Sequence, residues 1–438
     1  MKLPALVKSF LLGIPVGITF LDTVGYVARV EGISMQPALN PEAPVTDYVL
    51  LNRWSIRTRE ISRGDVVSLV SPKDPGQKII KRVVGIEGDL ISTIGYKQSF
   101  IRIPEGHCWV EGDHTGHSMD SNSFGPVSLG LVTAKASCIV WPPHRWQTLK
   151  PEIPQARRPV VLLGDIDGDG YTELVMGLTD RVVRSYRWVA DSNQPGSGKL
   201  IGLHKWECAN QIGTVTLNHL PDGTPCLLIA QPGGTLMKIR CHTNEEAGTV
   251  DSEVLATTFL EYHPLSCSRM RNSNVSTQIQ GGIKTREKDS SVSSRYAVAT
   301  LDGTLLLVQD ETVLWSIQVD HQLFALTKLD MTGDGRDEIV ACSWDGQTYI
   351  LDQEKCSVRF QLEESVVSFC SGYYTLQPGQ PPVPCLVYTT FTNKIYVYYD
   401  VQLPSLRAKR FIPEQPALIE ENPKQARLLM EWCLYGRW

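Results

Sequence analysis

Residues 338–350 read EIVACSWDGQTYI and decide the fold of the larger part of this 438-residue chain. An apolar, β-prone run occupies 338–343, Asp345 and Gly346 supply a tight turn, and polar and apolar residues mix in 347–350. This order predicts a strand, a turn and a second strand that pairs with the first. Four other stretches share the form: LVMGLTDRVVRSY at 174–186, LLIAQPGGTLMKI at 227–239, YAVATLDGTLLLV at 296–308 and CLVYTTFTNKIYV at 385–397.

The spacing of these predicted hairpins favours a β-propeller. They start roughly 40 to 70 residues apart, and near-regular repeats of paired strands are typical of propeller blades. We expect a partial propeller of about five blades over residues 159–402, followed by a Pro-rich tail at 403–438. The longest interval contains the polar, Ser-rich residues 242–293, which we expect to form a flexible insertion. An incomplete ring exposes two sheet edges, so closure by the five blades, dimerisation and poor folding are all open.

The first third of the chain has a different character. Residues 31–146 consist of short β-type runs between turns, with almost no helical periodicity, which predicts a compact all-β domain. Residues 147–158, QTLKPEIPQARR, carry two prolines and four charges. This composition predicts an extended linker. The whole chain is therefore expected to be mainly β.

Residues 1–30 form an apolar N-terminal segment. About 20 residues are needed to cross a bilayer, and residues 7–27 suffice only if Asp22 is tolerated at an interfacial or paired position. A signal peptide and a buried helix are the alternatives. No small-x-small cleavage site is clear, and the segment leads directly into the GISMQP motif at 32–37. We favour a retained membrane-anchor helix.

The composition argues against other classes. A hydrophobic content of 42% and a charged content of 20% are ordinary for a globular protein. The net charge of −5 gives no basis for nucleic-acid binding. The 11 cysteines are irregularly spaced, and most lie within apolar runs. We expect buried thiols rather than a disulfide framework.

Ser34 and Lys81 form a candidate catalytic pair. Ser34 lies within GISMQP at 32–37, and Lys81 lies within IIKRV at 79–83. A serine hydroxyl is a poor nucleophile until a base takes its proton, and a neutral lysine can be that base. A lysine with the ordinary pKa of about 10.4 is charged at neutral pH and cannot accept a proton. The fold must therefore lower the pKa of Lys81 by burial.

The residues around Lys81 suit such a shift. Alternate residues of a strand share a face, so Lys81 would lie beside Ile79 and Val83 while the charge of Arg82 points to the other face. The alternative is an edge-strand lysine that limits aggregation.

Three motifs occur in order along the first third: GISMQP at 32–37, KRVVGIEGD at 81–89 and GDHTGHSMDSNSFGPV at 112–127. The set resembles the signal-peptidase type of Ser/Lys endopeptidase, and residues 1–150 resemble the mitochondrial inner membrane protease branch of that family. The resemblance implies that Ser34 is the nucleophile and Lys81 the general base. It also implies that the Ser34 backbone N–H forms part of the oxyanion hole.

The resemblance implies supporting roles for further residues. Bacterial members carry a serine two residues before the nucleophile as a second oxyanion donor. Gly32 stands there in this chain, so another backbone N–H or a water must replace that donor. The third motif supports the dyad in the family and contains Asp113, Ser118, Asp120 and Ser121, where either serine could orient Lys81 by a hydrogen bond. Loop capping by these short polar side chains is the alternative.

The histidines of the first third do not predict a metal site. The HTGH sequence at 114–117 matches no zinc-ligand spacing, and His107 stands apart from it. We expect no cofactor for catalysis.

The family resemblance implies substrates, partners and a location. The substrates would be sorting presequences of proteins delivered to the mitochondrial intermembrane space. The catalytic domain would face that space from the inner membrane. Family members of this branch work beside a homologous protease subunit 1.

Two acidic loops in the second part suit a hard cation. Asp165, Asp167, Asp169 and Glu173 place oxygens at positions 1, 3, 5 and 9 of the loop DIDGDGYTE. Alternating carboxylates on a curled loop predict a Ca²⁺ site. The same layout recurs with one carboxylate fewer, which predicts weaker binding, at Asp330, Thr332, Asp334 and Glu338. The alternative is that both loops are Asp/Gly turns without an ion.

Acidic loops at blade entrances resemble FG-GAP repeats, and residues 159–402 resemble the integrin-alpha FG-GAP repeat-containing family. The phrases TDRVVR, TLDGTL, CSWDGQTYI and KIYVY carry the resemblance. It implies a propeller scaffold of the KICSTOR type, with KICSTOR subunits as partners, in amino-acid signalling to mTORC1 at the lysosomal surface.

Two functions therefore compete. The first is a membrane-anchored Ser/Lys peptidase with an accessory propeller, and the second is a propeller scaffold whose peptidase part is incidental. The three peptidase motifs are complete and the propeller is truncated, so we favour the enzyme. Because the two resemblances imply different compartments, a fusion of two genes is expected.

Overall fold

The structure is a computed structural model of the whole chain. It describes residues 19, 21, 23–41, 45–58, 60–94, 96–154, 157, 159–177, 181–190, 197–240, 260–264, 275–285, 294–310, 312–375, 377–403 and 406. Most of the predicted anchor at 1–30 and the predicted tail at 403–438 lie outside these residues. Within the described ranges, no helix has the length and apolar character needed to cross a membrane.

The first part of the chain folds around an eight-stranded antiparallel sheet with the order β1-β2-β9-β3-β4-β7-β8, in which β10 also pairs with β9. Two short helices, α2 (Trp54–Arg57) and α3 (Ser121–Phe124), and the β5–β6 pair flank the sheet. The strands are β1 (Gly25–Arg29), β2 (Tyr48–Asn52), β3 (Val66–Val70), β4 (Lys78–Gly85), β5 (Leu90–Ser92), β6 (Phe100–Arg102), β7 (His107–Glu111), β8 (Val127–Ser128), β9 (Val132–Trp141) and β10 (Gln147–Thr148).

The second part consists of five consecutive antiparallel sheets, four with four strands and the last with three. Each sheet is a meander, so neighbours in sequence pair in space. The first two sheets contain β11 (Val160–Gly164), β12 (Glu173–Gly177), β13 (Val182–Ala190) and β14 (Gly198–Glu207), then β15 (Val215–His219), β16 (Pro225–Gln231), β17 (Thr235–Ile239) and β18 (Leu260–Pro264).

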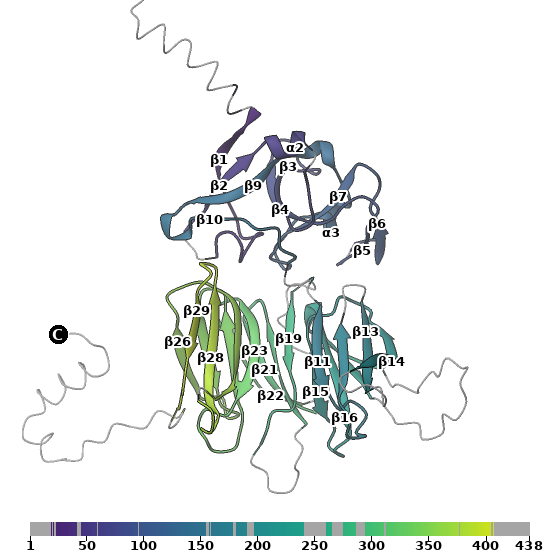
Figure 1. Cartoon of the computed structure of the whole chain (residues 1–438), viewed down its shortest axis with the longest axis vertical. Helices are drawn as coiled ribbons and strands as arrows, with labels where there is room; N and C mark the ends of the chain where they lie inside the picture. Colours follow the sequence, from purple (N-terminus) through teal and green to yellow (C-terminus); the bar gives the residue numbers. More distant parts are fainter. Residues whose placement is uncertain are drawn as a thin grey trace, which may run out of the picture.

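The remaining three sheets complete the arrangement that Figure 1 shows side by side. Their strands are β19 (Thr277–Gln280), β20 (Arg295–Thr300), β21 (Thr304–Gln309) and β22 (Thr312–Gln318), then β23 (Leu323–Leu329), β24 (Glu338–Ser343), β25 (Gln347–Leu351) and β26 (Ser357–Gln361), then β27 (Val366–Tyr374), β28 (Val383–Thr390) and β29 (Ile395–Tyr398). The prediction of a mainly β chain with a five-blade propeller-like part is confirmed.

All five predicted hairpins form, as β12–β13, β16–β17, β20–β21, β24–β25 and β28–β29. Part of the predicted flexible insertion at 242–293 differs from the expectation. β18 completes the second sheet by pairing with β17, and β19 opens the third sheet by pairing with β20. The polar composition of 242–293 did not predict these strands, because the strands that they pair with, β17 and β20, lie outside this stretch. Residues 242–259, 265–274 and 286–293 lie outside the described residues.

The predicted linker at 147–158 is docked rather than extended where it is described. β10 pairs with β9, and Leu149 N donates to Ser137 O at 2.9 Å. Arg157 is buried, and its guanidinium pairs with Glu111 at 2.5 Å. This ion pair ties the end of the linker to β7.

The two parts of the chain contact one another through loops at the ends of the propeller strands (Figure 1). The Arg145 guanidinium lies 5.9 Å from the centre of the Phe391 ring, and Arg181 donates to the Thr93 carbonyl. The cysteines in the described part of the chain are all free thiols, and most are buried, as predicted.

Candidate active site

The loop after β1 carries Ser34. Met35 and Leu39 bury their side chains in the core of the first part, with exposed fractions of 1% and 0%. These two buried side chains anchor the loop in the core, and the adjacent Ser34 lines a cleft at the surface. Gly32 has a φ of +86°, which a residue with a side chain rarely adopts.

Asn40 clamps the two ends of this loop. Its side-chain amide donates to Val30 O at 2.9 Å and to Gly32 O at 3.1 Å. Its side-chain oxygen accepts from Asp47 N at 2.8 Å, and its backbone N–H donates to the Asp47 carboxylate at 2.7 Å. Arg145 pairs with that carboxylate at 2.9 Å and also donates to Ala38 O at 3.0 Å. The buried Asp47–Arg145 pair thus stabilises the backbone of the loop that carries Ser34.

Lys81 approaches Ser34 from β4. Its Nζ lies 2.7 Å from Ser34 Oγ, and the residue is only 3% exposed. Burial lowers the pKa of Lys81 to about 8, against the opposing charges of Asp120 and Asp113. This pKa supplies a substantial neutral fraction near physiological pH, which a base requires. Spacing along the chain and the alternation of a strand predicted this environment.

Arg82 points away from Lys81, as predicted, and is buried as well. It forms a two-pronged ion pair with Asp113 at 2.7 Å and donates to Gly64 O at 2.7 Å. Burial by itself lowers the pKa of Arg82, but the Asp113 charge and hydrogen bond outweigh it and raise this pKa. Asp113 therefore binds Arg82 and affects Lys81 only through its charge.

The other polar residues of the third motif organise the loop around the pair. Asp120 accepts from Gly112 N at 2.9 Å and from Asn122 N at 3.0 Å, the second bond capping α3. Burial and the charge of Glu111 raise the pKa of Asp120. Ser121 Oγ accepts from Val110 N at 3.0 Å. Asp120 and Ser121 therefore both bind backbone N–H groups of the loops, as the alternative of loop capping predicts.

Ser118 lies close to the pair without a hydrogen bond to it. Its hydroxyl is buried, and in the described part of the chain no hydrogen bond joins Ser118 or Ser121 to Lys81. The prediction that one of these serines orients Lys81 directly is not seen in this geometry. Ser118 instead packs against Gly112 beside the Ser34 carbonyl.

Gly112 is a residue that the motif analysis did not single out. A Cβ added there would meet the Ser118 side chain and the Ser34 carbonyl oxygen. We expect Gly112→Ala to displace Ser34 and to reduce cleavage roughly 10²-fold, since misplacement by about 1 Å can cost that much. Cleavage rates measured beside Gly130→Ala check the expectation, because Gly130 has an ordinary φ and its Cβ position has only the Ser128 hydroxyl nearby, at 3.6 Å. Equal activity of the two variants would contradict it.

His114 links the nucleophile loop to the propeller. Its backbone N–H donates to Ser34 O at 3.2 Å. Its ring packs against Trp344, with centroids 5.8 Å apart, and its Nε2 lies 3.2 Å from the Gln322 amide nitrogen, so Nε2 accepts. Burial, and then the charge of His117, lower the pKa of His114 to about 4. The ring is neutral and does not contact the Ser34 hydroxyl.

A cleft of about 570 Å³ opens over the Ser34–Lys81 pair. It runs between the loop of Ser34 and the edges of β1 and β4, so a substrate strand could lie against either. Its lining combines apolar and polar side chains, among them Ala28, Val30, Leu51, Ile80, Glu31 and Met119. Of the residues that the structure describes, none accepts a hydrogen bond from the Ser34 N–H, which leaves that donor for an oxyanion.

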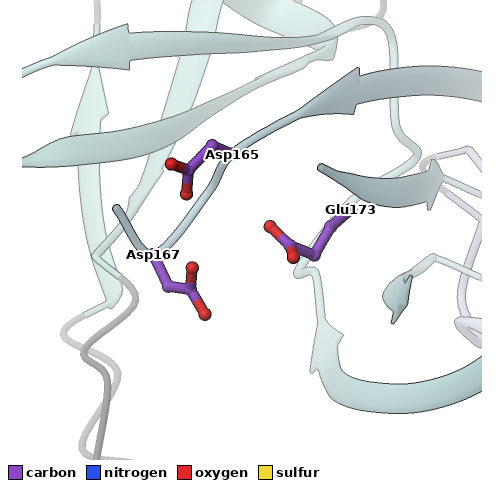
Figure 2. A group of neighbouring side chains, drawn as sticks. All are labelled: Asp165, Asp167 and Glu173. Atoms are coloured by element: carbon purple, nitrogen blue, oxygen red, sulfur yellow. The ribbon is translucent and has the colours of Figure 1, made fainter. Parts of the chain in front are cut away.

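The carboxylates of the first acidic loop are paired with an arginine from the neighbouring strand β13. Figure 2 shows the side chains of Asp165, Asp167 and Glu173 near one another. One carboxylate oxygen of each lies within 4.8 Å of the others. Arg187 on β13 pairs with Glu173, with Asp167 at 3.3 Å and with Asp169 at 2.7 Å. Burial and the charges of Glu173 and Asp169 still raise the pKa of Asp167, so one guanidinium leaves the cluster negative.

The second acidic loop repeats the backbone hydrogen bonds of the first, in which Glu173 accepts from Ile166 N, and adds a side-chain hydroxyl donor. Asp330, Asp334 and Glu338 also lie within 4.8 Å, but Glu338 accepts from Met331 N at 2.6 Å and from Thr332 Oγ1 at 3.0 Å. Asp334 pairs with Arg336 at 2.7 Å. Thr332 therefore serves as a donor to Glu338 in this geometry.

Two family models match the chain in different parts. The model for the integrin-alpha FG-GAP repeat-containing protein 2 matches residues 145–403, more than half of the chain. The model for signal peptidase, peptidase S26, matches residues 4–98 and 90–141. The boundary between the two matches, between residues 141 and 145, lies just before the predicted linker at 147–158.

Curated relatives divide in the same way. Mitochondrial inner membrane protease subunit 2 of Danio rerio is 60% identical over 158 residues, which are 36% of this chain and 86% of that protein. The Mus musculus protein of the same name is 59% identical and covered to 90%. KICSTOR complex protein ITFG2 of Mus musculus is 43% identical over 295 residues, 64% of this chain but only 65% of that protein.

Both resemblances inferred from the motifs are thereby confirmed. The chain belongs to two families, with a signal-peptidase-type serine protease of the peptidase S26 family in its first third and a member of the integrin-alpha FG-GAP repeat-containing protein 2 family in the remainder.

Proposed function

We propose that Ser34 and Lys81 form the catalytic dyad of this protease. The observation that carries the proposal is the 2.7 Å contact between a serine hydroxyl and a buried lysine whose pKa is lowered to about 8. Neutral Lys81 takes the hydroxyl proton as Ser34 Oγ attacks the scissile carbonyl. The Ser34 N–H stabilises the oxyanion, and the lysine ammonium returns a proton to the leaving amine.

Water then hydrolyses the acyl-enzyme. Neutral Lys81 takes a proton from the water as its oxygen attacks the ester carbonyl, and the Ser34 oxygen leaves with the proton returned by Lys81. No metal or cofactor enters either step. Ser118 and Ser121 act on the dyad by holding the loops, and Asp113 and Asp120 act by their charge as well. Gly32 contributes no hydroxyl to the oxyanion hole.

The substrates that fit this proposal are sorting presequences of proteins delivered to the mitochondrial intermembrane space. Support comes from the high identity to proteins named mitochondrial inner membrane protease subunit 2, of which 86–90% is matched. The catalytic domain would face the intermembrane space from the inner membrane, anchored by residues 1–30, beside a homologous subunit 1.

Cleavage of a presequence peptide by the full chain tests the dyad. Ser34→Ala should reduce the rate by at least about 10³-fold, since the nucleophile is lost. Ser99→Ala and Lys97→Met, at exposed turn positions remote from the cleft, are the controls and should leave the rate unchanged. Retained cleavage by the Ser34→Ala protein would sink the proposal.

A second candidate function rests on the propeller. The match to a KICSTOR complex protein spans 64% of this chain, and the five sheets are complete apart from one strand. A KICSTOR-type scaffold function predicts co-purification with KICSTOR subunits that is unaffected by Ser34→Ala. Failure to co-purify would leave only the protease function.

The two functions belong to different compartments, which supports a fusion of two genes. A single transcript read across the codons for residues 146–160 tests whether one messenger encodes both parts. Separate transcripts that never cross this region would contradict a natural fusion.

We further propose that Ca²⁺ competes with Arg187 at the first acidic loop. Removing the guanidinium should leave Asp165, Asp167, Asp169 and Glu173 with an unmet negative charge that a hard cation can neutralise. Ca²⁺ should therefore raise the melting temperature of Arg187→Met by several degrees and that of the parent chain less, as binding to the folded state stabilises it.

Differential scanning calorimetry with CaCl₂ and with MgCl₂ measures this effect. Arg336→Met, at the second loop, is the matched variant and should gain less. There Thr332 replaces a carboxylate and still donates to Glu338, whereas Arg187→Met frees an oxygen of Glu173. An equal effect of Ca²⁺ on all three proteins would count against competition by Arg187.

A further inference from the structure

The five propeller sheets pack on one another by one repeated contact. Each sheet presents one face to the sheet before it, called here the leading face, and one to the sheet after it, the trailing face. At each junction, apolar residues of a trailing face and the next leading face form one buried cluster. At the last junction, for example, Val340 and Ile350 pack in the same cluster as Phe369 and Tyr388.

The leading face of the first sheet has no such partner. On β11, Val160 and Leu162 face the second sheet, whereas Val161 and Leu163 on the opposite side are 56% and 67% exposed. Pairing adds side chains from the other three strands to this face, one of them charged: Leu174, Met176, Arg184, Tyr186, Trp188 and Leu200. Trp188 and Leu200 are also at least half exposed.

The trailing face of the fifth sheet is open in the same way. Tyr396 and Tyr398 on β29 pack toward the fourth sheet, whereas Ile395 and Val397 are 68% and 55% exposed. Registered pairing adds side chains from β27 and β28 to this face: Ser368, Cys370, Cys385, Val387 and Thr389, of which Cys385 is fully buried. Within the described residues, β11 packs on β15 of the second sheet and on no strand of the fifth to a comparable extent.

Scattered exposed apolar residues need no partner, but an apolar face of a sheet marks an interaction surface. The occupant is indicated by the chain itself, because every covered trailing face in this propeller is covered by a leading face. In the described part of the chain, the one leading face left uncovered is that of the first sheet. Among the described residues, the peptidase part contacts the propeller through loops such as those of Arg181 and Trp344 and not across this face.

The geometry points to head-to-tail association of two copies of this chain, in which the trailing face of the fifth sheet of one copy packs on the leading face of the first sheet of the next. Such a contact is heterologous: it uses two different surfaces, so each copy keeps one surface for a further partner. The contact extends the existing blade-to-blade packing and does not depend on the catalytic dyad.

Two variants that block one face each test this association on the full chain. Leu163→Glu places a charge on the leading face, and Ile395→Glu places one on the trailing face. Leu314→Glu, at a 43% exposed position on β22 away from both faces, is the control. Sedimentation velocity over a range of concentrations gives the mass of each protein alone and of equimolar mixtures.

We expect the parent chain and Leu314→Glu to associate with increasing concentration, and each face variant alone to remain monomeric. The mixture of Leu163→Glu with Ile395→Glu should form a 1:1 dimer and stop there, because one intact face of each kind remains. That dimer also shows that both variants fold. A monomeric parent chain, as closure of the ring within one chain would produce, overturns the inference. Self-association of either face variant alone, as a face-to-like-face contact would produce, overturns it too.

Discussion

Lys81→Met is expected to abolish presequence cleavage and at the same time to stabilise the protein. Cleavage is lost because no other group donates to or accepts from the Ser34 hydroxyl in the described structure. The stability gain follows from burial, which lowers the pKa of Lys81 from 10.5 to about 8. A shift of this size corresponds to about 3 kcal/mol at roughly 1.4 kcal/mol per pKa unit.

The sign of the effect depends on pH. Below pH 8 the folded protein must hold a charged lysine in a buried site, so the penalty is fully present there. Between pH 8 and 10.5 the unfolded chain binds the proton and the folded chain does not, so stability of the parent rises with pH. After subtracting the lost hydrogen bond to Ser34, the gain for Lys81→Met is about 2 kcal/mol at pH 7, and it disappears toward pH 10.5.

Urea unfolding of the two proteins at pH 7 and at pH 10 measures this difference. Lys97→Met, at an exposed position, is the control and should change stability little at either pH. An inactive Lys81→Met protein that is less stable than the parent at pH 7 would show that burying the charged lysine does not destabilise the folded protein.

Arg145→Met is expected to destabilise the first part of the chain by about 3–5 kcal/mol, because it leaves the Asp47 carboxylate buried without its partner. Asp47 and Arg145 are 0% and 6% exposed at the side chain. Because the same guanidinium holds Ala38 O and Asp47 holds Asn40, the Ser34 loop should loosen as well. Cleavage at a temperature where the variant is still folded should fall.

Arg63→Met is the matched control for this prediction. Arg63 also pairs with an aspartate, Asp89, at 2.6 Å, but its side chain is 54% exposed. Exposed pairs contribute about 0–1 kcal/mol. Denaturant unfolding of both variants compares them directly, and a similar loss of stability in the two would contradict the account of the loop.

The parts predicted from sequence were those set by local pattern. Each of the five hairpins carries its strand runs and its turn within about 13 residues, so periodicity sufficed. Ser34 and Lys81 were found because ordered motifs flank them and because strand alternation predicts which face each residue of 79–83 occupies. The lowered pKa of Lys81 follows from the same pattern.

The features that were missed depend on contacts between distant residues. β18 and β19 lie in a polar stretch, and only pairing with β17 and β20 makes them strands. Arg187 is 14 residues from Glu173, and only the β12–β13 register brings it over the acidic loop. Gly112 acts through backbone geometry, and Asn40 acts through side-chain hydrogen bonds to the backbone. The GD pair at 112–113 was a signal for Gly112, whereas no pattern marked Asn40.

The dependence of presequence cleavage on pH tests the central claim most directly. If neutral Lys81 is the general base, kcat/KM should rise tenfold per pH unit below about pH 8 and level off above it, where the lysine is deprotonated. Ser34→Ala should show no cleavage across this range. A plateau that begins near pH 6.5, as a histidine base would produce, or a rate still rising at pH 10 would contradict a buried Ser34–Lys81 dyad.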